Sequence, residues 1–112
     1  MLTIEKLREF GANVDEGVKR CVNNETFYLT MVTKSLQEPG FDNLKGAIEA
    51  GDLDKAFEIA HALKGVTGNL ALTPIDTPVR EITELLRSHT DMDYGPLVSE
   101  ILTKKNELAA LL

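Results

Sequence analysis

The sequence has little of several features that other classes of protein need. It contains one cysteine and no tryptophan, and only 5% of its residues are aromatic. A lone cysteine cannot form an internal disulfide, and Cys21, between Val18 and Val22, is predicted to be a small buried side chain. Cysteines and histidines together number three and are scattered, whereas structural zinc usually takes four such ligands. A disulfide scaffold and a structural zinc site are therefore excluded.

Positive charge is also in deficit. The chain has 12 Lys and Arg residues against 18 Asp and Glu residues, for a net charge of -6. Such a chain is repelled by the phosphates of nucleic acids and of anionic membranes. No segment approaches the roughly 18 apolar residues of a membrane span, and the first residues lack the apolar run of a signal peptide. We expect a cytoplasmic protein that binds neither nucleic acid nor membrane.

Motifs of several catalytic classes are missing. There is no P-loop and no Gly-x-Ser-x-Gly elbow, and Cys21 has no histidine near it in the sequence. Glu58 and His61 form the Glu-x-x-His half-motif of di-iron bundles, but His89, the only other histidine, has Leu86 three residues before it. The second half of a di-metal site is thus absent. We expect this chain to hold no metal and no cofactor.

Apolar residues recur at helical spacing, and no stretch alternates with a period of two. Helices are predicted at residues 4–10, 15–21, 24–37, 42–51, 52–70, 78–87 and 94–111. The expected fold is all-α, an antiparallel up-and-down four-helix bundle with one or two additional short N-terminal helices. Residues 1–112 are expected to form a single domain.

Capping residues set the expected ends of these helices. Thr3 can cap the first helix, and Asp42 and Asp52 can cap two later ones. Thr73-Pro74 and Thr77-Pro78 each resemble a helix start, and both cannot begin one regular helix because an interior proline breaks the hydrogen-bond ladder. We therefore expect a single turn at residues 74–76, followed by the main helix.

The predicted helix at residues 52–70 has two different faces. One is a broad, mostly apolar sector made of Leu53, Ala56, Phe57, Ala60, Leu63, Thr67 and Leu70. Beside it, His61, Lys64, Gly65 and Gly68 follow one strip at spacings of three and four residues. Each interior glycine costs about 1 kcal/mol relative to alanine. Close helix packing would explain a glycine pair, but a histidine and a lysine suit an apolar seam poorly, so we expect an exposed imidazole beside bare backbone.

An exposed histidine of this kind has a definite chemistry. Imidazole, with an ordinary pKa of about 6.5, is mostly neutral at pH 7 and offers a nitrogen nucleophile without a dedicated base. Lys64, one turn further on, would supply positive charge for the oxygens of a transferred phosphoryl group.

The segment AHALKGVTGNLAL, residues 60–72, resembles the signature of histidine-containing phosphotransfer (HPt) domains, a helix carrying A-H-x-L-K-G followed by small residues. Residues 14–36 also resemble the N-terminal helices of that family. Departures are Val66, where a small residue such as serine is frequent, and Ala71, where glycine is frequent. The resemblance implies that His61 is the phosphoacceptor and that Lys64 helps to hold the phosphoryl group. It also implies that Gly65 and Gly68 leave space for a receiver domain.

The resemblance further implies a function and partners. The protein would accept a phosphoryl group on His61 from a receiver aspartate and pass it to another receiver. It would be a phosphotransfer intermediate rather than a true enzyme, without ATP binding or kinase activity, and Mg²⁺ would belong to the partner receiver. Expected partners are response-regulator receivers and a hybrid histidine kinase, and we expect a monomer. An initial methionine and a well-capped last helix favour a complete protein.

An alternative remains at this point. The same fold and glycine surface would serve a non-catalytic helical docking module that binds receiver domains without phosphotransfer. The position of the His61 ring separates the two hypotheses. An exposed ring with Lys64 beside it favours chemistry, whereas a ring buried and hydrogen-bonded in the core favours docking alone.

Overall fold

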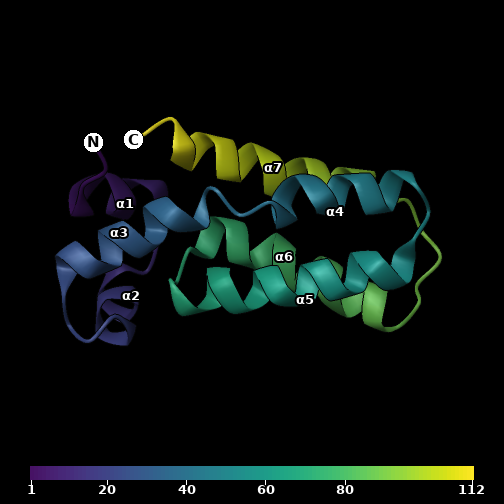
Figure 1. Ribbon diagram of the computed structural model, residues 1–112, viewed down its shortest axis with the longest axis horizontal. Helices are drawn as coiled ribbons and strands as arrows, with labels where there is room; N and C mark the ends of the chain where they lie inside the picture. The colour runs from purple at the N-terminus through teal and green to yellow at the C-terminus, as the bar shows by residue number, and fades with distance from the viewer.

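A computed structural model describes all 112 residues and contains seven helices and no strand (Figure 1). The predicted all-α fold is therefore confirmed. The helices are α1 (Ile4–Phe10), α2 (Val14–Arg20), α3 (Glu25–Ser35), α4 (Gly40–Glu49), α5 (Leu53–Asn69), α6 (Thr73–Arg87) and α7 (Gly95–Ala109).

Four of these helices pack in a ring. α5 lies against α4 and α6, and α7 closes the ring because it also contacts α4 and α6. The N-terminal helices α1, α2 and α3 lie together at one end of the molecule, where both termini are also found (Figure 1). Three helices rather than one or two thus precede the ring. Lys6 joins the two ends of the chain, since its Nζ donates a hydrogen bond to the carbonyl oxygen of Leu111 at 3.3 Å.

Four of the seven helices begin at a residue whose side chain caps them, and two of these residues are the predicted Thr3 and Asp52. The side chains of Thr3, Asn24 and Asp52 accept hydrogen bonds from backbone N–H groups three residues later, at 3.2, 3.0 and 3.2 Å. α1 and α4 are followed by Gly11 and Gly51, whose φ angles of 107° and 72° lie in the left-handed region that favours glycine. These local signals are sufficient to fix the corresponding boundaries.

The start of α4 differs from the prediction. The helix begins at Gly40, and Asp42 lies in its first turn instead of capping it. Phe41 is buried and belongs to the inner face of the helix together with Leu44. Pro39 already has helical φ and ψ angles of -65° and -16°, so the helix starts three residues earlier than a cap at Asp42 would allow.

The expectation of a break before Pro78 is wrong. α6 runs without interruption from Thr73 to Arg87, with Leu72 at the N-cap position, Pro74 in the first turn and Pro78 inside the helix. Pro78 is buried on the inner face of α6, beside Val79. Burial of this face compensates for the one backbone hydrogen bond that proline cannot donate.

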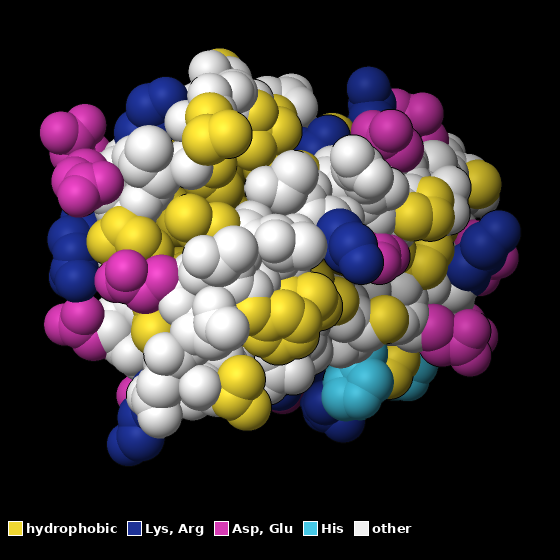
Figure 2. Space-filling model, turned by 60° about the vertical axis from the view of Figure 1, so that its left-hand side comes forward, with side chains coloured by type: hydrophobic (Ala, Val, Ile, Leu, Met, Phe, Trp, Pro, Cys, Tyr) yellow, Lys and Arg dark blue, Asp and Glu magenta, His cyan; other side chains and the backbone are white.

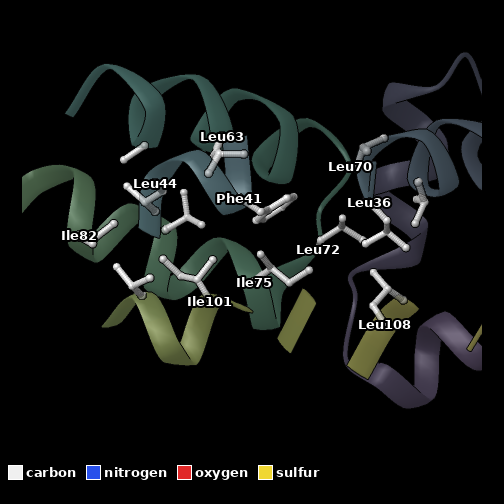
Figure 3. Packing of buried hydrophobic residues seen from close by; sticks show 14 of the residues in the cluster. Leu36, Phe41, Leu44, Leu63, Leu70, Leu72, Ile75, Ile82, Ile101 and Leu108 are labelled. Carbon is white, nitrogen blue, oxygen red and sulfur yellow. The ribbon is translucent and has the colours of Figure 1, made fainter. Parts of the chain in front are cut away.

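One hydrophobic cluster of 23 buried residues includes side chains from all seven helices. Figure 3 shows Leu63 of α5, Phe41 and Leu44 of α4, and Ile75 and Ile101 of α6 and α7 in the space that the four ring helices enclose. Cys21 belongs to the cluster, as predicted, and burial raises the pKa of its thiol. That residues 1–112 are a single domain stays a prediction.

Tyr28 ties the N-terminal helices to the end of α5. Its side chain is fully buried, and its hydroxyl donates a hydrogen bond to the carbonyl oxygen of Leu70 at 2.8 Å. Burial raises the pKa of Tyr28 to about 12, because the phenolate would lose its hydration. The neutral phenol is thus the form that the fold requires.

We predict that Tyr28→Phe lowers the free energy of unfolding by about 1 kcal/mol at pH 7, because one buried hydrogen bond is lost. The unfolded tyrosine ionises near its ordinary pKa of 10 and the folded one near 12, so the contribution of the phenol is lost as pH rises through this window. Urea unfolding of both proteins at a series of pH values should show the difference narrowing over that range. A difference independent of pH would contradict this role for the phenol.

Candidate functional site

Helix α5 buries one face and exposes the neighbouring one. Ala56, Ala60, Leu63 and Thr67 are buried against the other helices of the ring, which confirms the central part of the predicted apolar sector. His61 is exposed, and Lys64 next to it is half-buried. An exposed His61 ring with Lys64 beside it is the arrangement expected for phosphotransfer, whereas a buried ring was expected for docking alone.

The predicted strip of residues lines one shallow hollow on the surface. His61, Lys64, Gly65 and Gly68 all contribute to it, and the remaining lining residues are Arg20, Asn69 and Arg80. No carboxylate and no apolar side chain lines this hollow. Figure 2 shows histidine side chains at the surface with Lys or Arg side chains beside them. The structure therefore brings all four predicted site residues together and adds two arginines to them.

Each of the three cations in the hollow has an acidic partner outside it. The Nζ of Lys64 lies 3.7 Å from a carboxylate oxygen of Glu84 in α6. The Nε of Arg80 lies 2.6 Å from a carboxylate oxygen of Asp76, one turn earlier in α6. Arg20 pairs in the same way with Glu16 of α2. These partners hold the side chains in place, and all three cationic side chains still line the hollow.

Asp76 connects the two helices that form the site. One of its carboxylate oxygens accepts a hydrogen bond from the hydroxyl of Thr67 in α5 at 2.8 Å, and the other accepts from Arg80. The side chain of Asp76 is only 15% exposed, whereas that of Arg80 is 56% exposed, so the carboxylate is shielded from water and the guanidinium is not. Asp76 thereby positions Arg80 beside Gly68. The spacing of four residues between Asp76 and Arg80 indicates an ion pair within one helix. Nothing in the sequence shows that this pair faces α5.

Phe57 supports the imidazole ring of His61. The two rings are stacked, with centroids 5.8 Å apart and planes inclined by 20°. The guanidinium of Arg87 lies over Phe57, 5.1 Å from the ring centroid. Phe57 was predicted to be part of the apolar sector and is in fact half-buried at the edge of that sector. Its position four residues before His61 is the sequence signal for this contact.

The two glycines of the strip have different surroundings. A Cβ on Gly65 would meet no atom within 4 Å, so the backbone there is bare and open to a partner. A Cβ on Gly68 would lie 3.3 Å from Nη2 of Arg80 and 3.6 Å from Oδ1 of Asp76. Gly65 thus fits the predicted open surface. Gly68 also lines the hollow, and the missing side chain there lets Arg80 and Asp76 of α6 approach the backbone of α5 closely.

The C-terminal end of α5 is held by the N-terminal helices. Nη1 of Arg20 donates to the carbonyl oxygen of Gly68 at 2.8 Å, and the backbone N–H of Asn13 donates to that of Ala71 at 2.9 Å. Ala71 adopts a φ of 54°, in the left-handed region that glycine adopts without strain. The frequent glycine noted for this position in HPt domains therefore has a physical reason.

The remaining candidate residues do not form a second centre. His89 is exposed between α6 and α7 and does not line the hollow that contains His61. Its φ of 53° places it in a tight turn after α6. No three His, Cys, Asp or Glu side chains are grouped so that they could hold a metal ion. None of the seven helices has the length and apolar character required to cross a bilayer.

We predict that Gly65→Ala raises the free energy of unfolding by about 1 kcal/mol, because alanine is the better helix former and its methyl group meets no neighbour. Gly68→Ala is the matched comparison and should gain less, because its methyl group crowds Arg80. Chemical denaturation of both variants checks this order. Equal gains would contradict the crowding at Gly68, and a loss of stability in Gly65→Ala would show that the backbone at Gly65 is covered.

Comparison with known proteins identifies the family of this chain. The family model of the Hpt domain matches residues 29–112, three quarters of the chain, and includes α4 to α7 with the whole of α5. No curated protein and no solved structure gave a match. The resemblance drawn from the AHALKG segment is thereby confirmed. The chain belongs to the Hpt domain family, whose members carry out phosphotransfer in two-component signalling through receiver domains and kinases.

Proposed function

We propose that this protein accepts a phosphoryl group on Nε2 of His61 from the aspartyl phosphate of a receiver domain and passes it to a second receiver. The observation that carries the proposal is the exposed imidazole of His61 in a hollow lined by three cations and no carboxylate. Family membership supplies the reaction class. In this proposal the helices α4 to α7 form the predicted antiparallel up-and-down four-helix bundle. The protein acts as a monomer in the cytoplasm.

The transfer step follows from the chemistry of imidazole. The lone pair of Nε2 attacks the phosphorus atom of the aspartyl phosphate, and an N–P bond forms. The P–O bond to the receiver breaks, and its electron pair leaves with the aspartate carboxylate. The proton on Nδ1 stays on the ring or passes to water. In the second step a carboxylate of another receiver attacks the phosphorus, the N–P bond breaks, and neutral imidazole is restored.

Positioning and electrostatics are the contributions that this chain makes. Lys64 would neutralise charge on the phosphoryl oxygens, and the stacked ring of Phe57 keeps the imidazole of His61 in one orientation. The Mg²⁺ that the family resemblance implies would belong to the receiver. The proposal requires no cofactor and no ATP on this chain.

A second, apolar hollow adjoins the site and supports docking on the same face. It is lined by Met31 of α3, by Ala62 and Val66 of α5 and by Leu70 directly after α5, and it shares Gly65 and Asn69 with the polar hollow. Hydrophobic side chains also gather near the histidines in Figure 2. A receiver that delivers its aspartate to His61 could bury these side chains in the same contact.

The direct test incubates the protein with a receiver that carries a radiolabelled aspartyl phosphate. We predict that label moves to the wild-type protein and that His61→Gln abolishes this transfer, because the amide has no nucleophilic nitrogen lone pair. His89→Gln, at the other exposed histidine, is the matched control and should accept label normally. Transferred label is followed by gel autoradiography under alkaline conditions.

Two outcomes would refute the assignment. Labelling of His61→Gln at the wild-type rate would place the acceptor elsewhere. Binding of the phosphorylated receiver without any transfer to wild type would favour the non-catalytic docking module instead.

We predict that Gly65→Leu reduces transfer at least tenfold, because a side chain on bare backbone holds the receiver away from His61 and small misplacements are costly in such reactions. Gly46→Leu is the control. Gly46 is also an exposed helical glycine whose Cβ would meet nothing within 4 Å, but it lies in α4 and outside both hollows. Helix content by circular dichroism should stay close to wild type in both. Normal transfer by Gly65→Leu would show that Gly65 is not part of the docking surface.

A further inference from the structure

Arg20 reaches the site from a part of the chain that the family match does not cover. It is the last residue of α2, whereas the match begins at residue 29. No element of the AHALKG signature points to it. Its guanidinium nevertheless lines the same hollow as His61 and Lys64. The cations of the hollow therefore come from three helices, α2, α5 and α6.

Two hydrogen bonds fix the guanidinium of Arg20. Its Nε donates to a carboxylate oxygen of Glu16 at 2.9 Å, one turn earlier in α2, and its Nη1 donates to the carbonyl oxygen of Gly68 at 2.8 Å. A guanidinium has five N–H donors in a rigid plane, so most of them are left for another acceptor. The side chain is 46% exposed, which makes these donors accessible from the hollow.

The bond to Gly68 also sets the position of Arg20 relative to the imidazole. Gly68 lies two turns after His61 on the same strip of α5, so an arginine held at its carbonyl oxygen borders the hollow on that side. The backbone after Arg20 turns sharply, because Val22 and Asn23 adopt φ angles of 52° and 58°. This turn ends α2 at Arg20 and leads the chain into α3.

We infer that Arg20 is a phosphoryl-binding residue of this site, contributed by the N-terminal helices. When His61 carries a phosphoryl group, the free N–H donors of Arg20 bind its oxygens while the bond to Gly68 is kept. Planar guanidinium groups suit this task because two parallel N–H bonds match two phosphoryl oxygens. The inference rests on the proposed function, since it requires phosphorylated His61.

The test compares full-length wild type with Arg20→Gln and Arg20→Lys, and uses Arg8→Gln as the matched control. Arg8 is a similarly exposed arginine in the N-terminal helices, and it pairs with Asp15 at 2.9 Å as Arg20 pairs with Glu16. Each protein is phosphorylated with the small donor phosphoramidate, whose own P–N bond breaks with release of ammonia as the bond to His61 forms. Phosphorus NMR then gives the pH midpoint of the phosphohistidine titration.

A nearby cation favours the most deprotonated form of the phosphohistidine and lowers this midpoint. We therefore expect Arg20→Gln to raise the midpoint by about 0.3 to 0.7 pH units, a two- to fivefold change appropriate to a partly exposed ion pair. Arg20→Lys should recover part of the shift, and Arg8→Gln should leave the midpoint unchanged. If Arg20 only helped the helices to pack, the midpoint would not depend in this way on whether residue 20 carries a positive charge.

A midpoint in Arg20→Gln equal to that of wild type would overturn the inference and leave the proposed function intact. Absence of a phosphohistidine signal in wild type, or its persistence in His61→Gln, would overturn both. If Arg20→Gln does not fold, NMR of the wild-type protein tests whether Arg20 binds the phosphoryl group. The Nε–H resonance of Arg20 should shift on phosphorylation while that of Arg8 does not, and an unmoved Arg20 resonance would contradict the inference.

Discussion

Helix α5 must bury one stripe of side chains and keep the adjacent stripe in water, and the rest of the structure follows from this constraint. Leu63 and Thr67 are buried within the ring of four helices, while His61 and Gly65, on the same turns, are exposed. The boundary is sharp because a helix turns by about 100° per residue. Any rotation of α5 that buried the imidazole would also expose part of the core, so packing of the ring fixes the orientation of His61.

The end of α5 receives its own support from outside the ring. Carbonyl oxygens at Gly68, Leu70 and Ala71 accept hydrogen bonds from Arg20, Tyr28 and Asn13, all of which belong to the N-terminal part of the chain. The last carbonyl groups of a helix have no partners within the helix, and a buried one left unpaired is costly. Helices α1 to α3 thus provide both the cap of α5 and one cation of its surface hollow.

Much of the fold and the central part of the site could be predicted from the sequence. The caps at Thr3 and Asp52 and the spacing of His61, Lys64 and Gly65 are local signals, and the structure places these residues as expected. Pro78 could not be predicted correctly, because its tolerance within α6 depends on the burial of that helix face. The start of α4 at Gly40 likewise depends on the packing of Phe41.

The long-range contacts at the site could not be predicted from the sequence either. Arg20 donates to a carbonyl oxygen 48 residues away, and no local pattern encodes such a contact. Arg80 and Asp76 form an ordinary pair four residues apart, and only the packing of α6 on α5 brings them to Gly68. The difference between Gly65 and Gly68 has the same origin, since their local sequences gave no reason to treat the two glycines differently.

The proposed function depends on one claim, which is that the imidazole of His61 carries the phosphoryl group. The most direct measurement is site mapping by fragmentation mass spectrometry at alkaline pH, on wild-type protein that has been exposed to a phosphorylated receiver. The account predicts that the added phosphate is found on His61. Phosphate on His89, or on a carboxylate or hydroxyl side chain, would contradict it.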